Sequence, residues 1–177
     1  IHIASRTLSK CQAIIESIHD KGSLQRPGVL QAHALDAMNV EATKFLIRAT
    51  HSRIVINAGS PFLNMPVLAA CIETAAASLD TASPEDPDKG CEPPPWYANH
   101  EWKRRQACRD AGVTAVLGAG FDPGVVNAYA RYAVDTCFDT VDSIDIIDIN
   151  AGSHGRYFAT NFDPEINFRE FTATAWS

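Results

Sequence analysis

The chain opens with Ile1-His2-Ile3-Ala4-Ser5-Arg6-Thr7, an apolar run that ends abruptly in three polar residues. Apolar side chains then recur at helical spacing, at positions 8, 11, 14, 15 and 18. Thr7 stands where a helix N-cap is expected. The stretch therefore predicts a strand that passes directly into a helix over residues 8–19.

The same alternation continues along the chain. Short buried strands are predicted at 29–35, 53–57, 76–79 and 113–117, and helices begin near Asn39, Ser60-Pro61, Trp96 and Pro123. Strands that alternate with helices favour an α/β protein with a doubly wound parallel sheet of the Rossmann type. We expect one such domain at 1–123 and the start of a second α/β domain at 124–177, opened by a long strand at 141–150.

The polar end of the first strand carries the clearest chemical signal. In a Rossmann unit the second strand ends at the adenosine ribose, where a carboxylate binds the 2′-hydroxyl of NAD and an Arg accommodates the 2′-phosphate of NADP. Here the end carries Ser5 and Arg6 and no carboxylate, which indicates NADP. The glycine-rich turn that should precede this strand is absent, so we expect a chain truncated at both ends, lacking the central first strand and unstable by itself.

Further polar residues follow the predicted strands at the ligand-binding edge of the sheet. Asn57-Ala58-Gly59 allows close backbone approach to a cofactor, although a plain strand–helix turn would look similar. Asp36 and Asp80 end neighbouring strands and either contact a ligand or cap a turn. The stretch GAGFDPG at 118–124 has two interpretations: a second phosphate site, or a bend into the next domain with Asp122 capping the following helix.

Composition excludes several classes of function. The formal net charge of −6 and the pI near 5.4 disfavour nucleic acid or an anionic membrane as partner. No apolar run is long enough to span a bilayer. The five cysteines form no CxxC pair and the six histidines show no ligand spacing, so we expect free thiols, a cytoplasmic location and no metal.

Six blocks of the chain together resemble the saccharopine dehydrogenase-like family, and within it the polyamine branch. The blocks are IASRTLSKC at 3–11, INAGSPFLNMPVLAACIET at 56–74, LDTA at 79–82, PPWYANHEWKRR at 94–105, VTAVLGAGFDPGVVNAYARYA at 113–133 and DSIDIIDINAGSHGRYFATNFDPEINFREFT at 142–172. The blocks at 94–105 and 142–172 favour polyamine metabolism over lysine metabolism.

The resemblance implies an NADPH-dependent reductase and a homodimer. It would condense aspartate β-semialdehyde with a diamine or triamine and reduce the imine to carboxynorspermidine or carboxyspermidine. A saccharopine-forming reductase and a non-catalytic nucleotide-binding fragment remain alternatives.

The resemblance also implies roles for individual residues. The cofactor would be held by Ser5, Arg6 and Thr7 at the 2′-phosphate, by Asp36 near the adenine, and by Asn57, Ala58 and Gly59 near the nicotinamide. The substrate end would comprise Asp122, Pro123, Gly124, His154, Gly155, Arg156 and Asn161. The proton donor is left open among Glu101, Lys103 and His154.

Overall fold

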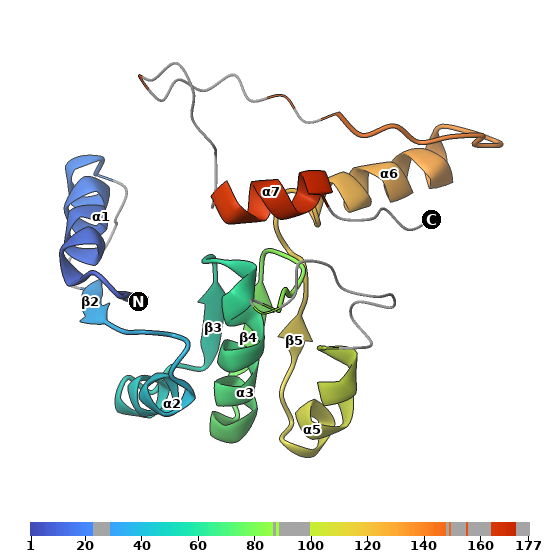
Figure 1. The fold of residues 1–177 in the computed structure, drawn as a ribbon. Helices are drawn as coiled ribbons and strands as arrows, with labels where there is room; N and C mark the ends of the chain where they lie inside the picture. Colours follow the sequence, from blue (N-terminus) through green and yellow to red (C-terminus); the bar gives the residue numbers. More distant parts are fainter. Residues whose placement is uncertain are drawn as a thin grey trace. The chain divides into compact units, whose positions relative to one another are not determined.

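The structure, a computed structural model, describes residues 1–22, 29–86, 88, 100–147, 149, 155 and 164–172. Helices and strands alternate through most of this part (Figure 1). In chain order the elements are β1(His2–Ser5), α1(Leu8–Asp20), β2(Gln31–Ala34), α2(Val40–Ala49), β3(Ile54–Asn57), the 3₁₀ helix η1(Pro61–Leu63), α3(Asn64–Thr74), β4(Ala77–Asp80), η2(Trp102–Arg104), α5(Arg105–Asp110), β5(Ala115–Val116), α6(Val125–Thr136) and α7(Pro164–Thr172).

The strands form two sheets, one of order β1-β2 and one of order β3-β4-β5. β1 and β2 run parallel, with Ser5 opposite Ala34. Near the start of β4, Ser78 N donates to Thr114 O, and at its end Asp80 O accepts from Ala119 N. Because the start of β4 pairs with the residue before β5 and the end of β4 pairs with a residue after β5, the two strands are also parallel. These pairings are those of strands 2-3 and 4-5-6 in a doubly wound sheet, and the predicted Rossmann-type α/β class is confirmed.

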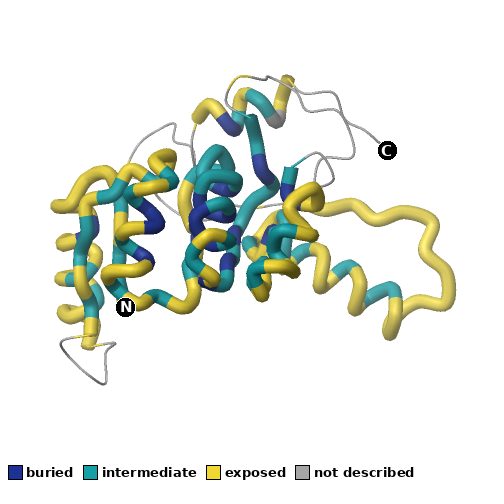
Figure 2. The backbone as a smooth tube through the Cα atoms, turned by 90° about the horizontal axis from the view of Figure 1, so that it is seen from below, coloured by how far each residue is buried: buried dark blue, intermediate teal, exposed yellow. Residues whose placement is uncertain are grey.

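The chain divides into two compact units. Unit 1 comprises 1–57, 65–78 and 105–115, and unit 2 comprises 58–64, 79–104 and 116–177. Half of the buried apolar side chains that the structure describes belong to α3 (Val67, Leu68, Ala70 and Cys71). Figure 2 shows the buried residues as separate dark-blue stretches of the backbone. Ala70 and Cys71 are fully buried, and burial raises the pKa of the Cys71 thiol to about 11.

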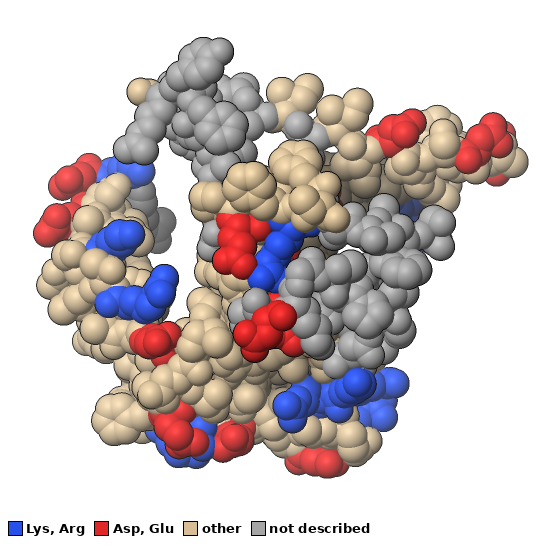
Figure 3. Space-filling view, in the orientation of Figure 1, with Lys and Arg blue, Asp and Glu red and all other residues tan. Residues whose placement is uncertain are grey.

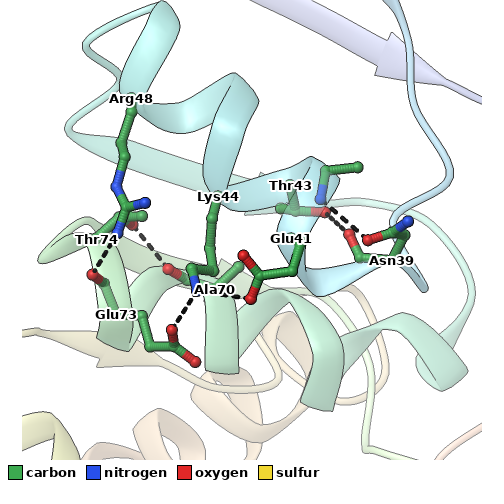
Figure 4. Close-up of polar contacts among 9 residues, drawn as sticks. Asn39, Glu41, Thr43, Lys44, Arg48, Ala70, Glu73 and Thr74 are labelled. Atoms are coloured by element: carbon green, nitrogen blue, oxygen red, sulfur yellow. Dashed lines mark hydrogen bonds and ion pairs between the residues drawn. The ribbon is translucent and has the colours of Figure 1, made fainter.

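An ion-pair group joins α2 to α3 within unit 1 (Figure 4). The Lys44 ammonium, on a side chain only 10% exposed, contacts Glu41 at 2.7 Å and also Glu73. Arg48 Nη2 donates to the Glu73 carbonyl at 3.4 Å. The hydrogen bonds to Glu41 and Glu73 raise the pKa of Lys44, so it stays charged while its stem packs between the helices.

In unit 2, α7 is tied to the segment after β4 by Arg169. Its guanidinium donates to Asp86 O at 3.0 Å, lies 3.6 Å from Glu85 and stacks over the Phe62 ring at 5.0 Å. Figure 3 shows Lys and Arg side chains in small groups among those of Asp and Glu. Lys103, Arg104 and Arg105, in η2 and at the start of α5, are exposed.

Two local predictions are wrong. The described residues of 141–150 form no strand, since the exposed Ile144, Ile146 and Ile147 have no partner strand in the described part of the chain to pair with. Asp122 does not cap α6: the helix begins at Val125, and Asn127 Oδ1 accepts from Gly124 N at 2.8 Å instead.

Candidate functional site

The junction between β1 and α1 is a tight turn held by Ser5. Its hydroxyl donates to Thr7 O at 3.0 Å and accepts from Thr7 N at 3.3 Å. The buried Cys11 thiol lies 3.2 Å from the same oxygen. This network fixes the backbone that presents Arg6.

The next two side chains point their polar groups to solvent. Arg6 and Thr7 are exposed, and in the described part of the chain neither side chain has a hydrogen-bond or ion-pair partner. Lys10 N donates to Thr7 O at 3.1 Å, but the first turn of α1 contains no acidic residue to offset its partial positive charge. A free guanidinium beside an uncapped helix N-terminus fits a phosphate well.

Asp36 lies close to this turn. It follows β2, the parallel neighbour of β1, and Leu35 N donates to Ser5 O at 2.9 Å across the strand ends. Asp36 is exposed, and its carboxylate accepts from Met38 N at 3.1 Å. The structure therefore brings Ser5 and Asp36 to one sheet edge in unit 1.

Asn57, Ala58 and Gly59 follow β3 directly. Asn57 is buried at 7% exposure, whereas Ala58 and Gly59 are exposed and leave the backbone accessible. Ser60, which the sequence indicated as a helix cap, makes no capping hydrogen bond, and its hydroxyl is buried without a partner among the described residues.

The loop 118–124 uses its own amides internally. Gly118 N donates to Asp80 Oδ1 at 2.6 Å, Ala119 N to Asp80 O at 2.8 Å, and Gly120 N to Pro123 O at 3.0 Å. A phosphate would need these N–H groups free. The second-phosphate-site interpretation is therefore wrong, and Asp80 is a turn-capping residue. Asp122 is exposed, while Pro123 and Gly124 are partly covered.

Three polar side chains are buried together behind this loop: Asn64, Asp80 and Glu101, with 3%, 5% and 4% exposure. Burial is the main cause that raises the pKa of Glu101 to about 8, and the Asp80 charge adds to it. Burial also raises the pKa of Asp80, against the Gly118 amide, which lowers it. Sequence reasoning named Asp80 and Glu101 separately; it missed Asn64, a polar residue at the start of an otherwise apolar helix.

The remaining predicted residues are only partly described. Lys103 is exposed on η2, and Gly155 is exposed with a φ of 64°. His154, Arg156 and Asn161 lie outside the described residues. Over the described ranges, no group of three or more His, Cys, Asp or Glu is arranged for a metal ion.

The structure describes four of the five cysteines (Cys11, Cys71, Cys108 and Cys137), and all four are free thiols, as predicted. None of the described helices is both long and apolar enough to cross a bilayer.

Parallel strands that alternate with helices, with the exposed Arg6 at the turn that follows β1, are typical of a dinucleotide-binding protein. A family model, the saccharopine dehydrogenase NADP-binding domain, matches residues 1–116. The chain belongs to this family, and its cofactor is NADP(H).

Curated relatives match nearly the whole chain. Carboxynorspermidine synthases from Vibrio alginolyticus and Vibrio cholerae are each 45% identical over 96% of the chain, and a carboxyaminopropylagmatine dehydrogenase from Synechocystis is 42% identical over 97%. The chain spans 40–41% of the length of these relatives. Saccharopine dehydrogenase (L-Glu forming) from Saccharomyces cerevisiae has a similar fold, with a TM-score of 0.54 and 21% identity, over 76% of this chain and 24% of that one.

Proposed function

We propose that the protein is an NADPH-dependent reductase of polyamine biosynthesis. It joins aspartate β-semialdehyde to a diamine or triamine and reduces the imine to carboxynorspermidine or carboxyspermidine. The observation that carries this proposal is the 42–45% identity to three enzymes named for such products, over 96–97% of the chain.

The β1–α1 turn supports the cofactor assignment. Arg6 would pair with the 2′-phosphate by charge-assisted hydrogen bonds, while Ser5 and Thr7 shape and line its site. Asp36 would lie near the adenine, and Asn57, Ala58 and Gly59 near the nicotinamide. The bound cofactor would supply the hydride. The residues of this chain would hold it and favour the 2′-phosphate form, because residues 5–7 contain an Arg and no carboxylate.

The substrate end would be formed by the exposed Asp122 with Pro123, Gly124, Gly155, His154, Arg156 and Asn161. Arg156 would bind the carboxylate of the aldehyde, and an acidic protein suits a cationic amine. An imine accepts hydride readily once protonated, so the demand on a protein acid is modest. Glu101, Lys103 and His154 remain the candidate donors.

The proposed organisation is a cytoplasmic homodimer in the full-length protein. Its NADP-binding domain comprises residues 1–123 of this chain, and residues 124–177 begin the domain for substrate and dimer contacts. Size-exclusion chromatography with light scattering tests the dimer directly.

A saccharopine-type reductase is the second candidate, favoured by the family match over residues 1–116. It would combine a different amine with an aldehyde derived from aminoadipate. A third candidate, a nucleotide-binding protein without catalysis, would bind NADPH and turn over none of these substrates.

One assay separates the three. NADPH oxidation by the full-length protein is followed at 340 nm with aspartate β-semialdehyde and a panel of putrescine, 1,3-diaminopropane and agmatine. We expect oxidation that requires both the aldehyde and an amine. Oxidation only with aminoadipate semialdehyde and glutamate would establish the second candidate, and NADPH binding without any oxidation would establish the third.

A further inference from the structure

Asp80 and Glu101 form a buried pair of carboxyl groups, and the oxygens of Glu101 lack well-placed hydrogen-bond donors among the described residues. Both side chains belong to unit 2 and both are at least 95% buried. Asp80 Oδ1 accepts from Gly118 N at 2.6 Å. Neither carboxyl oxygen of Glu101 has a hydrogen-bond partner of good geometry in the part of the chain that the structure describes.

An ionised Glu101 would therefore be poorly placed. A carboxylate can only accept hydrogen bonds, and a buried one without donors is strongly destabilising. The neighbouring Asn64 amide, which also donates to Ala82 O at 2.7 Å, only partly offsets this, because its hydrogen bond is the smallest influence on the Glu101 pKa and burial is the largest. A protonated Glu101, by contrast, has an O–H donor, and the carboxylate of Asp80, with which its side chain interacts, is an acceptor.

We propose that Asp80 and Glu101 share one proton, and that protonated Glu101 is a positioning residue that keeps Asp80 on the Gly118 amide and thereby holds loop 118–124.

The charges around the pair indicate which carboxyl carries the proton. The Gly118 amide favours ionised Asp80, whereas Glu101 has the Asp80 charge beside it. Asn64, from α3, favours ionised Glu101 only in part. In the segment that carries Glu101, Lys103 and Arg104 are exposed and His100 is half-buried; the one charged side chain among the described residues that acts on the Glu101 pKa is Asp80.

The pair supports a loop that has little room to move. Gly118 and Ala119 are both bound to Asp80, and a Cβ on Gly120 would collide with the backbone oxygen of Thr81. The loop carries Asp122, Pro123 and Gly124. Only the link from loop shape to substrate rests on the proposed function; the shared proton does not.

The test compares the pH dependence of thermal unfolding of the full-length protein with that of Glu101→Gln. Gln donates to Asp80 as the protonated acid does, but it does not titrate. Because the folded pKa of about 8 lies above the unfolded value, the folded state holds an extra proton between roughly pH 4.5 and 8. Wild-type stability should fall relative to the variant over this range, by up to about tenfold in the unfolding constant per pH unit, and then level off.

Two variants act as controls. Glu16→Gln, on the exposed face of α1, should give a curve parallel to the wild type. Asp80→Asn removes the like charge and should move the levelling point to lower pH. Parallel curves for wild type and Glu101→Gln would overturn the shared proton, as would an Asp80→Asn curve that levels at the wild-type pH.

Positioning of the loop is read separately by hydrogen exchange at the amides of 118–120. Protection should persist in Glu101→Gln and fall at least tenfold in Glu101→Ala. Unchanged protection in Glu101→Ala would overturn the positioning role. Neither readout involves substrate turnover, so failure of the proposed reaction is distinguishable from failure of this inference.

Discussion

The helices α1 and α2 both follow a strand of the same parallel pair, yet they begin in opposite ways. At α2, Asn39 Oδ1 accepts from Ala42 N at 3.0 Å and the first turn contains Glu41. At α1, the Thr7 side chain makes no capping bond and the first turn holds no acid. Helix N-termini attract negative charge. We infer that the N-terminus of α2 is stabilised by the side chains of Asn39 and Glu41, whereas the N-terminus of α1 is stabilised by a bound anion.

The largest expected effect comes from removing the Arg6 guanidinium beside the N-terminus of α1. Arg6→Ala should weaken NADPH binding by about 30- to 100-fold, the equivalent of losing charge-assisted hydrogen bonds worth about 2–3 kcal/mol. NADH binding should hardly change, because NADH lacks the 2′-phosphate. Isothermal titration of the full-length protein with each cofactor measures both.

Lys21→Ala provides the matched control, since Lys21 lies at the opposite end of α1. An equal loss of NADPH and NADH affinity in Arg6→Ala would mean that the residue supports structure rather than recognising the phosphate.

Loop 118–124 is a third strand–helix connection, and it differs from the first two because its amides donate to Asp80 and Pro123. Gly120→Ala should destabilise the protein by about 2 kcal/mol, since the new Cβ meets the Thr81 backbone, which cannot rotate away. Gly112→Ala is the control: it has open space and a φ of 66°, so it should show only the smaller backbone strain of about 1 kcal/mol. Denaturant unfolding compares them, and equal losses would contradict the steric explanation.

The stability of α2 should depend on its N-cap, Asn39. Asn39→Ala removes the acceptor for Ala42 N and should lower the free energy of unfolding by about 1 kcal/mol, whereas Asn39→Asp keeps an acceptor and should stay near the wild type. Urea unfolding monitored by circular dichroism measures this difference. A neutral Asn39→Ala would show that the cap is dispensable.

The smallest effect on stability is expected at Thr7, which precedes α1 and makes no capping hydrogen bond. Thr7→Ala deletes a hydroxyl that makes no capping bond, so the free energy of unfolding should change by less than about 0.5 kcal/mol. NADPH affinity should fall a few-fold. A loss of stability as large as that of Asn39→Ala would erase the distinction between the two helices.

Sequence alone predicted the elements whose signal is local. The apolar run before Ser5 and the helical spacing after Thr7 indicated the β1–α1 turn, and Asn39 was correctly placed as the start of α2. The meeting of Asp80 with Glu101 was not predicted, because it depends on contacts between segments distant in the chain. Similarly, the fingerprint-like GAGFDPG could not reveal that Asp80 occupies its amides.

The most direct test of the account is a side-by-side titration of the full-length protein with NADPH and NADH at the same ionic strength. An Arg that is exposed and unpaired among the described residues, at a turn without a carboxylate, predicts an NADPH dissociation constant at least about tenfold below that of NADH. Equal affinities, or tighter binding of NADH, would contradict the assignment of Ser5, Arg6 and Thr7 as the 2′-phosphate site.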